Sequence, residues 1–110
     1  MRTTYGVVWR EGSGRLARGR LELLPQSLRL DGVVGSLPAD REVRYEDLDG
    51  VHVGRAPGER IQGRPSLVLE RSSGGTIAIA SVAEPGVIGE LADRLGALRR
   101  AGTCGGRSPS

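Results

Sequence analysis

The chain has no lysine, phenylalanine or asparagine, and it has one cysteine and one histidine among its 110 residues. A single cysteine excludes a disulfide within the chain. A single histidine excludes metal sites that need two or more imidazole ligands. No apolar run approaches the roughly 20 residues that a membrane-spanning helix needs. These absences argue against a disulfide scaffold, a histidine-rich metal site and an integral membrane protein.

The residues that are present fit one small globular domain. Hydrophobic residues make up 37% and charged residues 26%, which is ordinary for a soluble domain. The N-terminal residues lack the continuous apolar segment of a secretory signal. We therefore expect a cytoplasmic domain over residues 1–101 and a disordered tail over residues 102–110. Cys104 lies in that tail, without the electropositive pocket that a reactive thiol needs.

All 16 basic residues are arginine, and enrichment in arginine, glycine and alanine indicates a GC-rich, bacterial type of genome. Residues 1–30 carry six arginines against two acids, whereas residues 31–70 carry five against eight. The net charge of +3 is too small to predict nucleic-acid binding. Aromatic side chains on which nucleic-acid bases could stack are also scarce. We expect Tyr5 and Trp9, on one face of the first strand, to pack in the core.

Alternating apolar and charged side chains predict a β-hairpin at residues 15–24 and 27–32. A strand turns successive side chains to opposite faces, so the alternating leucines specify one dry face and one wet face. These leucines are Leu21, Leu23, Leu28 and Leu30. We expect the turn at Pro25-Gln26.

The same alternation predicts five further strands, at residues 3–10, 42–48, 51–55, 67–71 and 76–80. The connections between them are rich in glycine, proline and aspartate. We expect a loop around Gly35, Pro38 and Asp40, a reversal at Asp49-Gly50, a mobile loop over residues 56–65 and a hairpin turn over residues 72–75.

Apolar residues at three- and four-residue spacings predict one amphipathic C-terminal helix. They are Ile88, Leu91, Ala92, Leu95 and Leu98. Ser81 and Glu84 have the spacing of a capping box, and Pro85 suits a first helical turn. We expect Gly102 to end the helix.

Seven strands followed by one helix is the order of the pleckstrin-homology-like superfold. Residues 19–30 resemble the second and third strands of bacterial pleckstrin-homology and GRAM-type domains. Residues 43–53 resemble the segment that enters the fourth strand and turns into the fifth. The resemblance covers residues 3–101 and implies a mainly β, seven-stranded split barrel whose open corner is plugged by the helix. An oligonucleotide-binding barrel fits less well, since its helix usually lies between strands three and four.

The residues do not predict catalysis. His52 is expected to point outward from its strand, without the base, nucleophile or further ligands that a catalytic or metal site requires. The acids Glu46, Asp47 and Asp49 are expected to form a turn, because their spacing does not match a calcium loop. We therefore predict no enzyme activity, no cofactor and no metal.

The resemblance implies a binding or scaffolding module for a protein partner. Domains of this superfold commonly recognise extended peptides between the fifth strand and the C-terminal helix. In this sequence that peptide groove would be lined by Val51, Val53 and Arg55 on the strand and by Ile88 and Leu95 on the helix.

Two alternatives stay open. Phosphoinositide-binding members of the superfold carry basic residues on the first two strands, where this sequence has Arg10, Arg15, Arg18 and Arg20. These arginines would bind anionic phospholipid headgroups at the inner face of the membrane. Against this, we expect the loops to lack apolar residues that insert into lipid. The other alternative is a structural domain that associates with itself.

Overall fold

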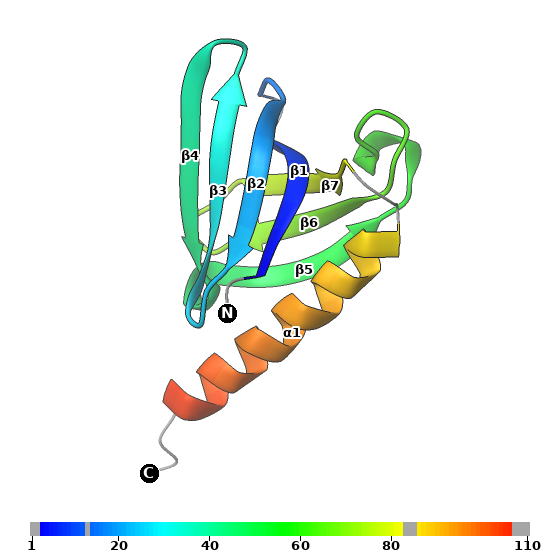
Figure 1. Ribbon diagram of the computed structural model, residues 1–110. Coiled ribbons are helices and arrows are strands. Elements are labelled where there is room, and N and C mark those ends of the chain that lie inside the picture. Colours follow the sequence, from blue (N-terminus) through cyan, green and yellow to red (C-terminus); the bar gives the residue numbers. More distant parts are fainter. Residues whose placement is uncertain (1–2, 13, 83–85, 107–110) are drawn as a thin grey trace.

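The computed structural model describes residues 3–12, 14–82 and 86–106 of the chain (Figure 1). Within these residues the elements follow the predicted order of seven strands and a C-terminal helix. The strands are β1 (Thr3–Glu11), β2 (Ala17–Leu23), β3 (Ser27–Val34), β4 (Leu37–Arg44), β5 (Leu48–Gly54), β6 (Ser66–Arg71) and β7 (Thr76–Ser81). The helices are α1 (Gly86–Gly106) and two short 3-10 helices, η1 (Tyr45–Asp47) and η2 (Pro57–Glu59).

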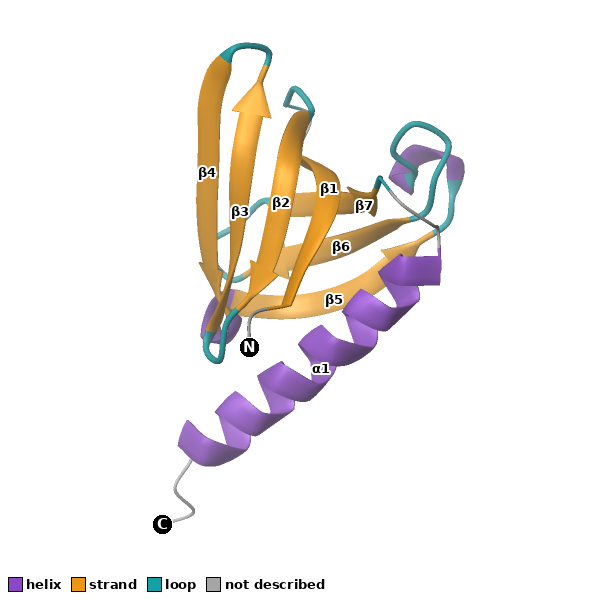
Figure 2. Cartoon of the chain, in the orientation of Figure 1, coloured by secondary structure: helices purple, strands orange, loops and turns teal. Residues whose placement is uncertain are grey.

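All strand pairs are antiparallel, and they form one sheet in the order β4-β3-β2-β1-β7-β6-β5. The pairing of β1 with β7 joins the two halves, β1–β4 and β5–β7. The strands of one half cross those of the other, so the sheet curls into a half-barrel (Figure 2). Its two edges are β4 and β5.

The predicted hairpin of β2 and β3 is confirmed. Leu21 lies opposite Leu30 and Leu23 opposite Leu28. The backbone N–H of Leu24 donates a 2.8 Å hydrogen bond to the carbonyl of Ser27 across the turn at residues 25–26. We call the face that carries these leucines the inner face of the sheet and the opposite face the outer face.

The core lies between the inner face and α1. Buried side chains from all seven strands contribute to it, and the predicted apolar stripe of the helix packs into it. Trp9, on β1, is buried as expected. From α1 the buried residues are Ile88, Leu91 and Leu95. The helix runs alongside β5 and packs mainly against β5 and η1, so it covers the open side of the half-barrel (Figure 1).

The loop predicted around Gly35, Pro38 and Asp40 is instead a tight turn followed by β4. Gly35 has a left-handed φ of 64°, and Val34 pairs with Leu37 directly beyond the turn. Pro38 and Asp40 both lie in the strand. A proline is tolerated there because β4 is an edge strand, where one missing N–H need not break a ladder bond.

The reversal predicted at Asp49-Gly50 is also wrong. Asp49 and Gly50 lie within β5, at a bulge between Leu48 and Gly50. The chain changes direction earlier, in η1, where Tyr45 is buried. Burial of this aromatic side chain fixes the position of the corner. The pattern of turn-forming residues did not indicate that position.

The ends of the helix differ from the prediction. Ser81 belongs to β7 and is not the helix cap, while Glu84 and Pro85 lie outside the described residues. The helix continues through Gly102 to Gly106, since one glycine inside a helix costs only about 1 kcal/mol and does not by itself end it. Of the predicted tail, residues 107–110 lie outside the described residues. No helix in the described ranges is both long enough and apolar enough to cross a bilayer.

Candidate functional site

The predicted peptide groove, which we call the β5–α1 groove, is only partly at the surface. Val51 and Val53 are half-buried on the inner side of β5, and Arg55 is exposed just beyond its end. Ile88 and Leu95 are 2% and 0% exposed, so they belong to the core beneath the groove. A ligand along β5 would therefore contact the two valines and not these two helix residues.

The two edges of the sheet differ in how they are protected against pairing with another strand. Edge strand β4 carries Pro38 and four charged residues, at positions 40, 41, 42 and 44, and both features discourage further pairing. On β5 the bulge and a 3.2 Å hydrogen bond from the Arg99 guanidinium to the carbonyl of Leu48 protect only the first residues. From Gly50 to Gly54 the only ionisable side chain is His52. This section of β5 is the less protected edge.

Of the four arginines of the alternative anion site, three share the outer face of the sheet and one lies apart from them. Arg18 and Arg20 point to the outer face of β2, and strand alternation places Arg10 on the outer face of β1. Arg15 lies in the connection between β1 and β2, and it lines a hollow that none of the other three lines. Arg18 lines a second hollow, on the outer face.

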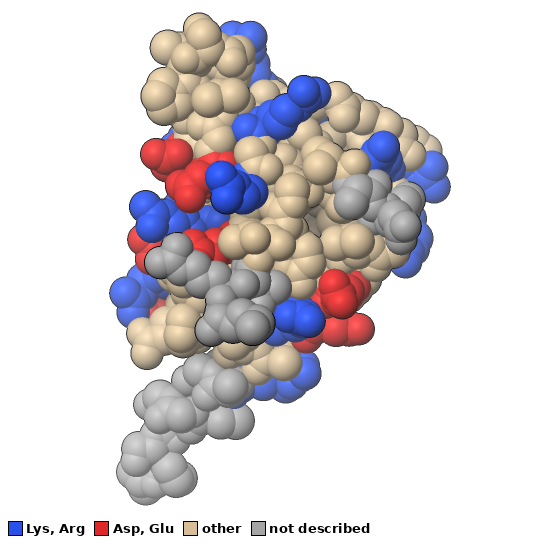
Figure 3. Space-filling model, viewed as in Figure 1, with Lys and Arg blue, Asp and Glu red and all other residues tan. Residues whose placement is uncertain are grey.

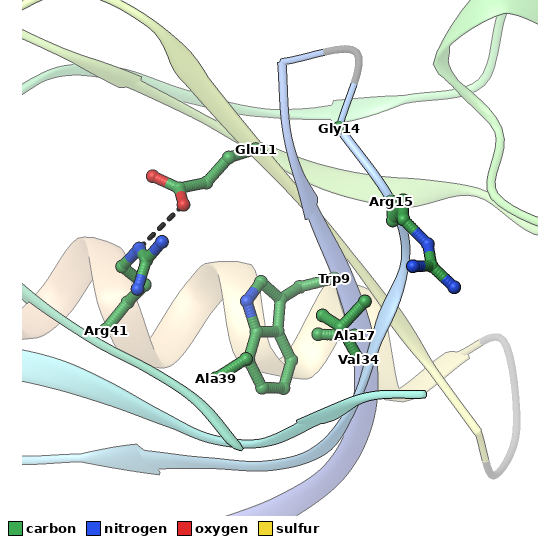
Figure 4. Close-up of a pocket in the computed structure, with 8 residues that line it drawn as sticks. All are labelled: Trp9, Glu11, Gly14, Arg15, Ala17, Val34, Ala39 and Arg41. Atoms are coloured by element: carbon green, nitrogen blue, oxygen red, sulfur yellow. Dashed lines mark hydrogen bonds and ion pairs between the residues drawn. The ribbon is translucent and has the colours of Figure 1, made fainter. Parts of the chain in front are cut away.

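The first hollow, which we call the mouth hollow, has a volume of about 400 Å³ and opens beside the turn between β3 and β4 (Figure 4). Its lining residues are Trp9, Glu11, Gly14, Arg15, Ala17, Val34, Ala39 and Arg41. The Glu11 carboxylate accepts a 2.6 Å hydrogen bond from Nε of Arg41 and lies 3.3 Å from an Arg71 guanidinium nitrogen. Arg15 is the other cation in the lining, and its guanidinium points away from the Trp9 indole (Figure 4). The mouth hollow therefore combines apolar side chains with a partly neutralised set of charges.

The second hollow, which we call the outer hollow, also measures about 400 Å³. It is lined by Val8, Arg18, Gly19, Gln62, Arg64, Ser81 and Val82. The sequence prediction missed Gln62 and Arg64, because residues 56–65 were expected to form a mobile loop. In the structure Ile61 anchors this loop, with 1% of its surface exposed. It is the one large apolar residue between residues 56 and 65, and this was the sign in the sequence that the loop is anchored.

The end of the β3–β4 hairpin is apolar, contrary to the expectation that the loops lack such residues. Val33 is 44% exposed and Leu37 is 67% exposed. The outer end of this hairpin is largely uncharged, whereas charges of both signs mix below it (Figure 3). Arg15 reaches this turn, since its guanidinium lies 3.8 Å from the position of a Cβ built on Gly35. We call Val33, Leu37 and Pro38 the hairpin tip.

His52 is exposed, as predicted, and its Nε2 lies 3.1 Å from an Oε2 carboxylate oxygen of Glu59. This hydrogen bond lowers the pKa of Glu59 below its ordinary value. Cys104 lies within α1. In the described part of the chain, no three histidine, cysteine or acidic side chains are grouped so that they could hold a metal ion.

The comparison with protein-family models finds no match for this sequence, and the comparison with curated proteins finds none either. Solved structures with the same fold do match. The N-terminal PH domain of Vps36 superposes with a TM-score of 0.64 at 15% identity, over 92% of this chain and 77% of that one. The C-terminal domain of an unknown protein from Leishmania infantum superposes with a TM-score of 0.62 at 15% identity, over 84% of this chain and 81% of that one.

The fold is therefore pleckstrin-homology-like: a curled, seven-stranded antiparallel sheet with one C-terminal helix. The predicted fold class is confirmed. Identities of 15% show the fold alone, because unrelated functions share such folds.

Proposed function

We propose that this chain is a non-catalytic module that binds an extended peptide of a protein partner as an added strand on β5. The observation that carries the proposal is the difference between the two sheet edges. Proline and charged residues protect β4, whereas β5 from Gly50 to Gly54 has neither and lies beside α1. An unprotected edge offers backbone N–H and C=O groups to another chain.

The side chains along β5 define the peptide that would fit. Backbone hydrogen bonds would supply affinity without regard to sequence, and side-chain contacts would supply specificity. Val51 and Val53 are half-buried and two residues apart, so they favour small apolar residues at alternate positions of the peptide. Arg55 is exposed at the end of β5 and favours an acidic residue there.

Peptides selected by display against the purified domain would test this proposal. Binding should shift the backbone NMR signals of residues 50–54 and protect their amides from hydrogen exchange. Val53→Gln should weaken binding by about tenfold, which corresponds to roughly 1.4 kcal/mol. His52→Gln is the matched control, because it introduces the same residue one position away on the opposite face. Equal effects of both substitutions, or shifts confined to other surfaces, would contradict the proposal.

A second candidate function is attachment to anionic membranes at the cytoplasmic side, and the hairpin tip is the observation that favours it. Apolar side chains that insert, next to basic side chains, bind lipid surfaces better than either alone. Co-sedimentation with anionic vesicles would test it. Binding that is lost in Leu37→Ser and Arg15→Glu supports this candidate, whereas loss only in the double variant Arg18→Glu, Arg20→Glu places attachment on the outer face of β2.

Self-association is the remaining alternative, and it would use the same open edge of β5. Sedimentation of the purified chain distinguishes self-association from peptide binding at that edge. A monomer that binds selected peptides supports the peptide proposal, whereas a dimer that Val53→Gln dissociates supports self-pairing.

A further inference from the structure

The outer hollow is lined by two arginines from segments far apart in the sequence. Arg18 comes from β2, and Arg64 comes from the connection between β5 and β6. Among the residues that the structure describes, no acidic side chain lines this hollow. This arrangement contrasts with the mouth hollow, where Glu11 pairs with Arg41 and Arg71. The described lining of the outer hollow is therefore basic.

The loop that supplies Arg64 is held in a defined shape against the outer face. The buried side chain of Ile61 packs with Val8 and Ala80 in a small second core. Two backbone hydrogen bonds of 2.9 Å join Ile61 and Arg64 in both directions. The Arg64 side chain therefore starts from a fixed backbone position at the rim of the hollow.

The turn between these two residues contains a strained backbone position. Gln62 has a left-handed φ of 53°, and within the described residues it is the only non-glycine residue with a positive φ. Such a conformation is uncommon for glutamine, and it persists where the surrounding structure requires it. It places Gln62, whose side-chain amide can donate hydrogen bonds, in the lining of the hollow.

The two arginines differ in how their side chains are held. The Arg64 guanidinium donates a 2.8 Å hydrogen bond to the carbonyl of Ser81, which fixes its position. Arg18 is exposed and forms no ion pair or hydrogen bond with any other described residue. On the outer face it lies between Val8 and Val33, which supply no opposite charge.

We propose that the outer hollow is a binding site for a phosphate monoester group, held between Arg18 and Arg64 with the Gln62 amide as a further donor. Guanidinium groups match the oxygens of a phosphate group through paired N–H donors, and two of them compensate a dianion. The hollow of about 400 Å³ also leaves room beside Val8 and Val82 for the group that carries the phosphate. That group belongs to a soluble phosphorylated compound or to a lipid, since the same phosphate chemistry occurs in both. This proposal does not depend on peptide binding at β5.

The test is an NMR titration of the full chain with glycerol phosphate and with inorganic phosphate at constant ionic strength. The signals of residues 18, 62 and 64 should shift together and saturate. Arg18→Gln and Arg64→Gln should each weaken binding by about tenfold or more. Arg20→Gln is the matched control, because Arg20 lies two residues along the same face of β2 but does not line the hollow.

Arg18 is exposed, so Arg18→Gln tests the proposal even if Arg64→Gln alters the loop. Arg64→Lys keeps the positive charge but removes the paired N–H donors, so it separates the contribution of charge from that of donor geometry. Weakening by Arg20→Gln equal to that of Arg18→Gln, or no saturable shift at residues 18, 62 and 64, would overturn the proposal. Vesicles with and without phosphatidate identify the source. Binding to phosphatidate vesicles that Arg18→Gln abolishes assigns a lipid headgroup, whereas saturable binding of glycerol phosphate without vesicle binding assigns a soluble compound.

Discussion

The hydroxyl of Tyr45 donates a 2.6 Å hydrogen bond to the carbonyl oxygen of Leu24 and so joins η1 to the turn between β2 and β3. The backbone N–H of Tyr45 donates to the carbonyl of Gln26 in the same turn, at 3.0 Å. Burial of the ring raises the pKa of Tyr45 to about 12. One residue therefore holds the corner where the chain leaves β4 and enters β5.

Tyr45→Phe should lower the free energy of unfolding by about 1 kcal/mol, because it removes one hydrogen bond and leaves the Leu24 carbonyl without it. The folded state favours the neutral phenol, since its pKa lies above the ordinary 10.0. This contribution is fully present below pH 10 and is lost as the pH rises through about 12. Denaturant unfolding of both proteins across this range is the measurement.

The matched control for Tyr45 is Tyr5→Phe, because the hydroxyl of Tyr5 has no hydrogen-bond partner in the described part of the chain. We expect Tyr5→Phe to change stability less than Tyr45→Phe at neutral pH. A larger loss in Tyr5→Phe would show that the contact between Tyr45 and Leu24 does not hold the corner.

The C-terminal helix should be required for stability. Leu91 and Leu95 are fully buried against the sheet, so Leu91→Ala or Leu95→Ala should cost about 2–5 kcal/mol, as truncation of buried leucines does. Glu90→Ala, at an exposed neighbouring position, should change stability by less than about 0.5 kcal/mol. Thermal or denaturant unfolding measures both. A leucine variant as mild as the Glu90 variant would show that α1 does not close the core.

Much of the fold could be predicted because one face of the sheet is dry. The alternation of Leu21, Leu23, Leu28 and Leu30 fixes both the strands and their register, since a shift by one residue would turn the leucines to solvent. The start of β4 was missed because its residues are exposed. An edge strand tolerates Pro38 and charged side chains, so its sequence resembles a loop.

The candidate sites were less predictable because they depend on contacts between distant segments. The sequence grouped Arg18 with its neighbours Arg15 and Arg20, whereas the fold places it beside Arg64 in the outer hollow. Similarly, the helical spacing of Ile88 and Leu95 identified an apolar stripe, but it could not tell a groove from the core. Only the packing of α1 on the sheet separates these two readings of the stripe.

Two glycines should respond to substitution in opposite ways. A Cβ on Gly19 would lie 1.8 Å from the carbonyl oxygen of Asp31 and 2.5 Å from the Cα of Gly32, so Gly19→Ala should push β2 away from β3 and destabilise the sheet. A Cβ on Gly89 meets nothing within 4 Å on the exposed side of α1. Gly89→Ala should therefore stabilise the helix by about 0.5–1 kcal/mol. If both variants unfold at the same midpoint, the close approach at Gly19 has no energetic consequence.

The pair of His52 and Glu59 should give a pH-dependent contact between β5 and the loop that follows it. Glu59 lies in η2, and its side chain covers Gly54, where a built Cβ would be 2.6 Å from the Cβ of Glu59. The hydrogen bond from His52 lowers the pKa of the Glu59 carboxyl. The pair therefore contributes fully above the ordinary carboxyl value of 4.5, and its contribution is lost as the pH falls through the lowered pKa.

His52→Val should raise the pKa of Glu59 toward 4.5, because it removes the hydrogen bond that stabilises the carboxylate. NMR titration of the Glu59 carboxyl carbon in both proteins measures this change. Overall stability should change little, since both side chains are more than 40% exposed and such pairs are weak. Glu70 is the control carboxyl, because it lies on the neighbouring strand and makes no ion pair with His52 in the described residues. An equal shift at Glu70 would indicate a general change in charge, and an unchanged Glu59 would show that the hydrogen bond from His52 does not hold its carboxylate.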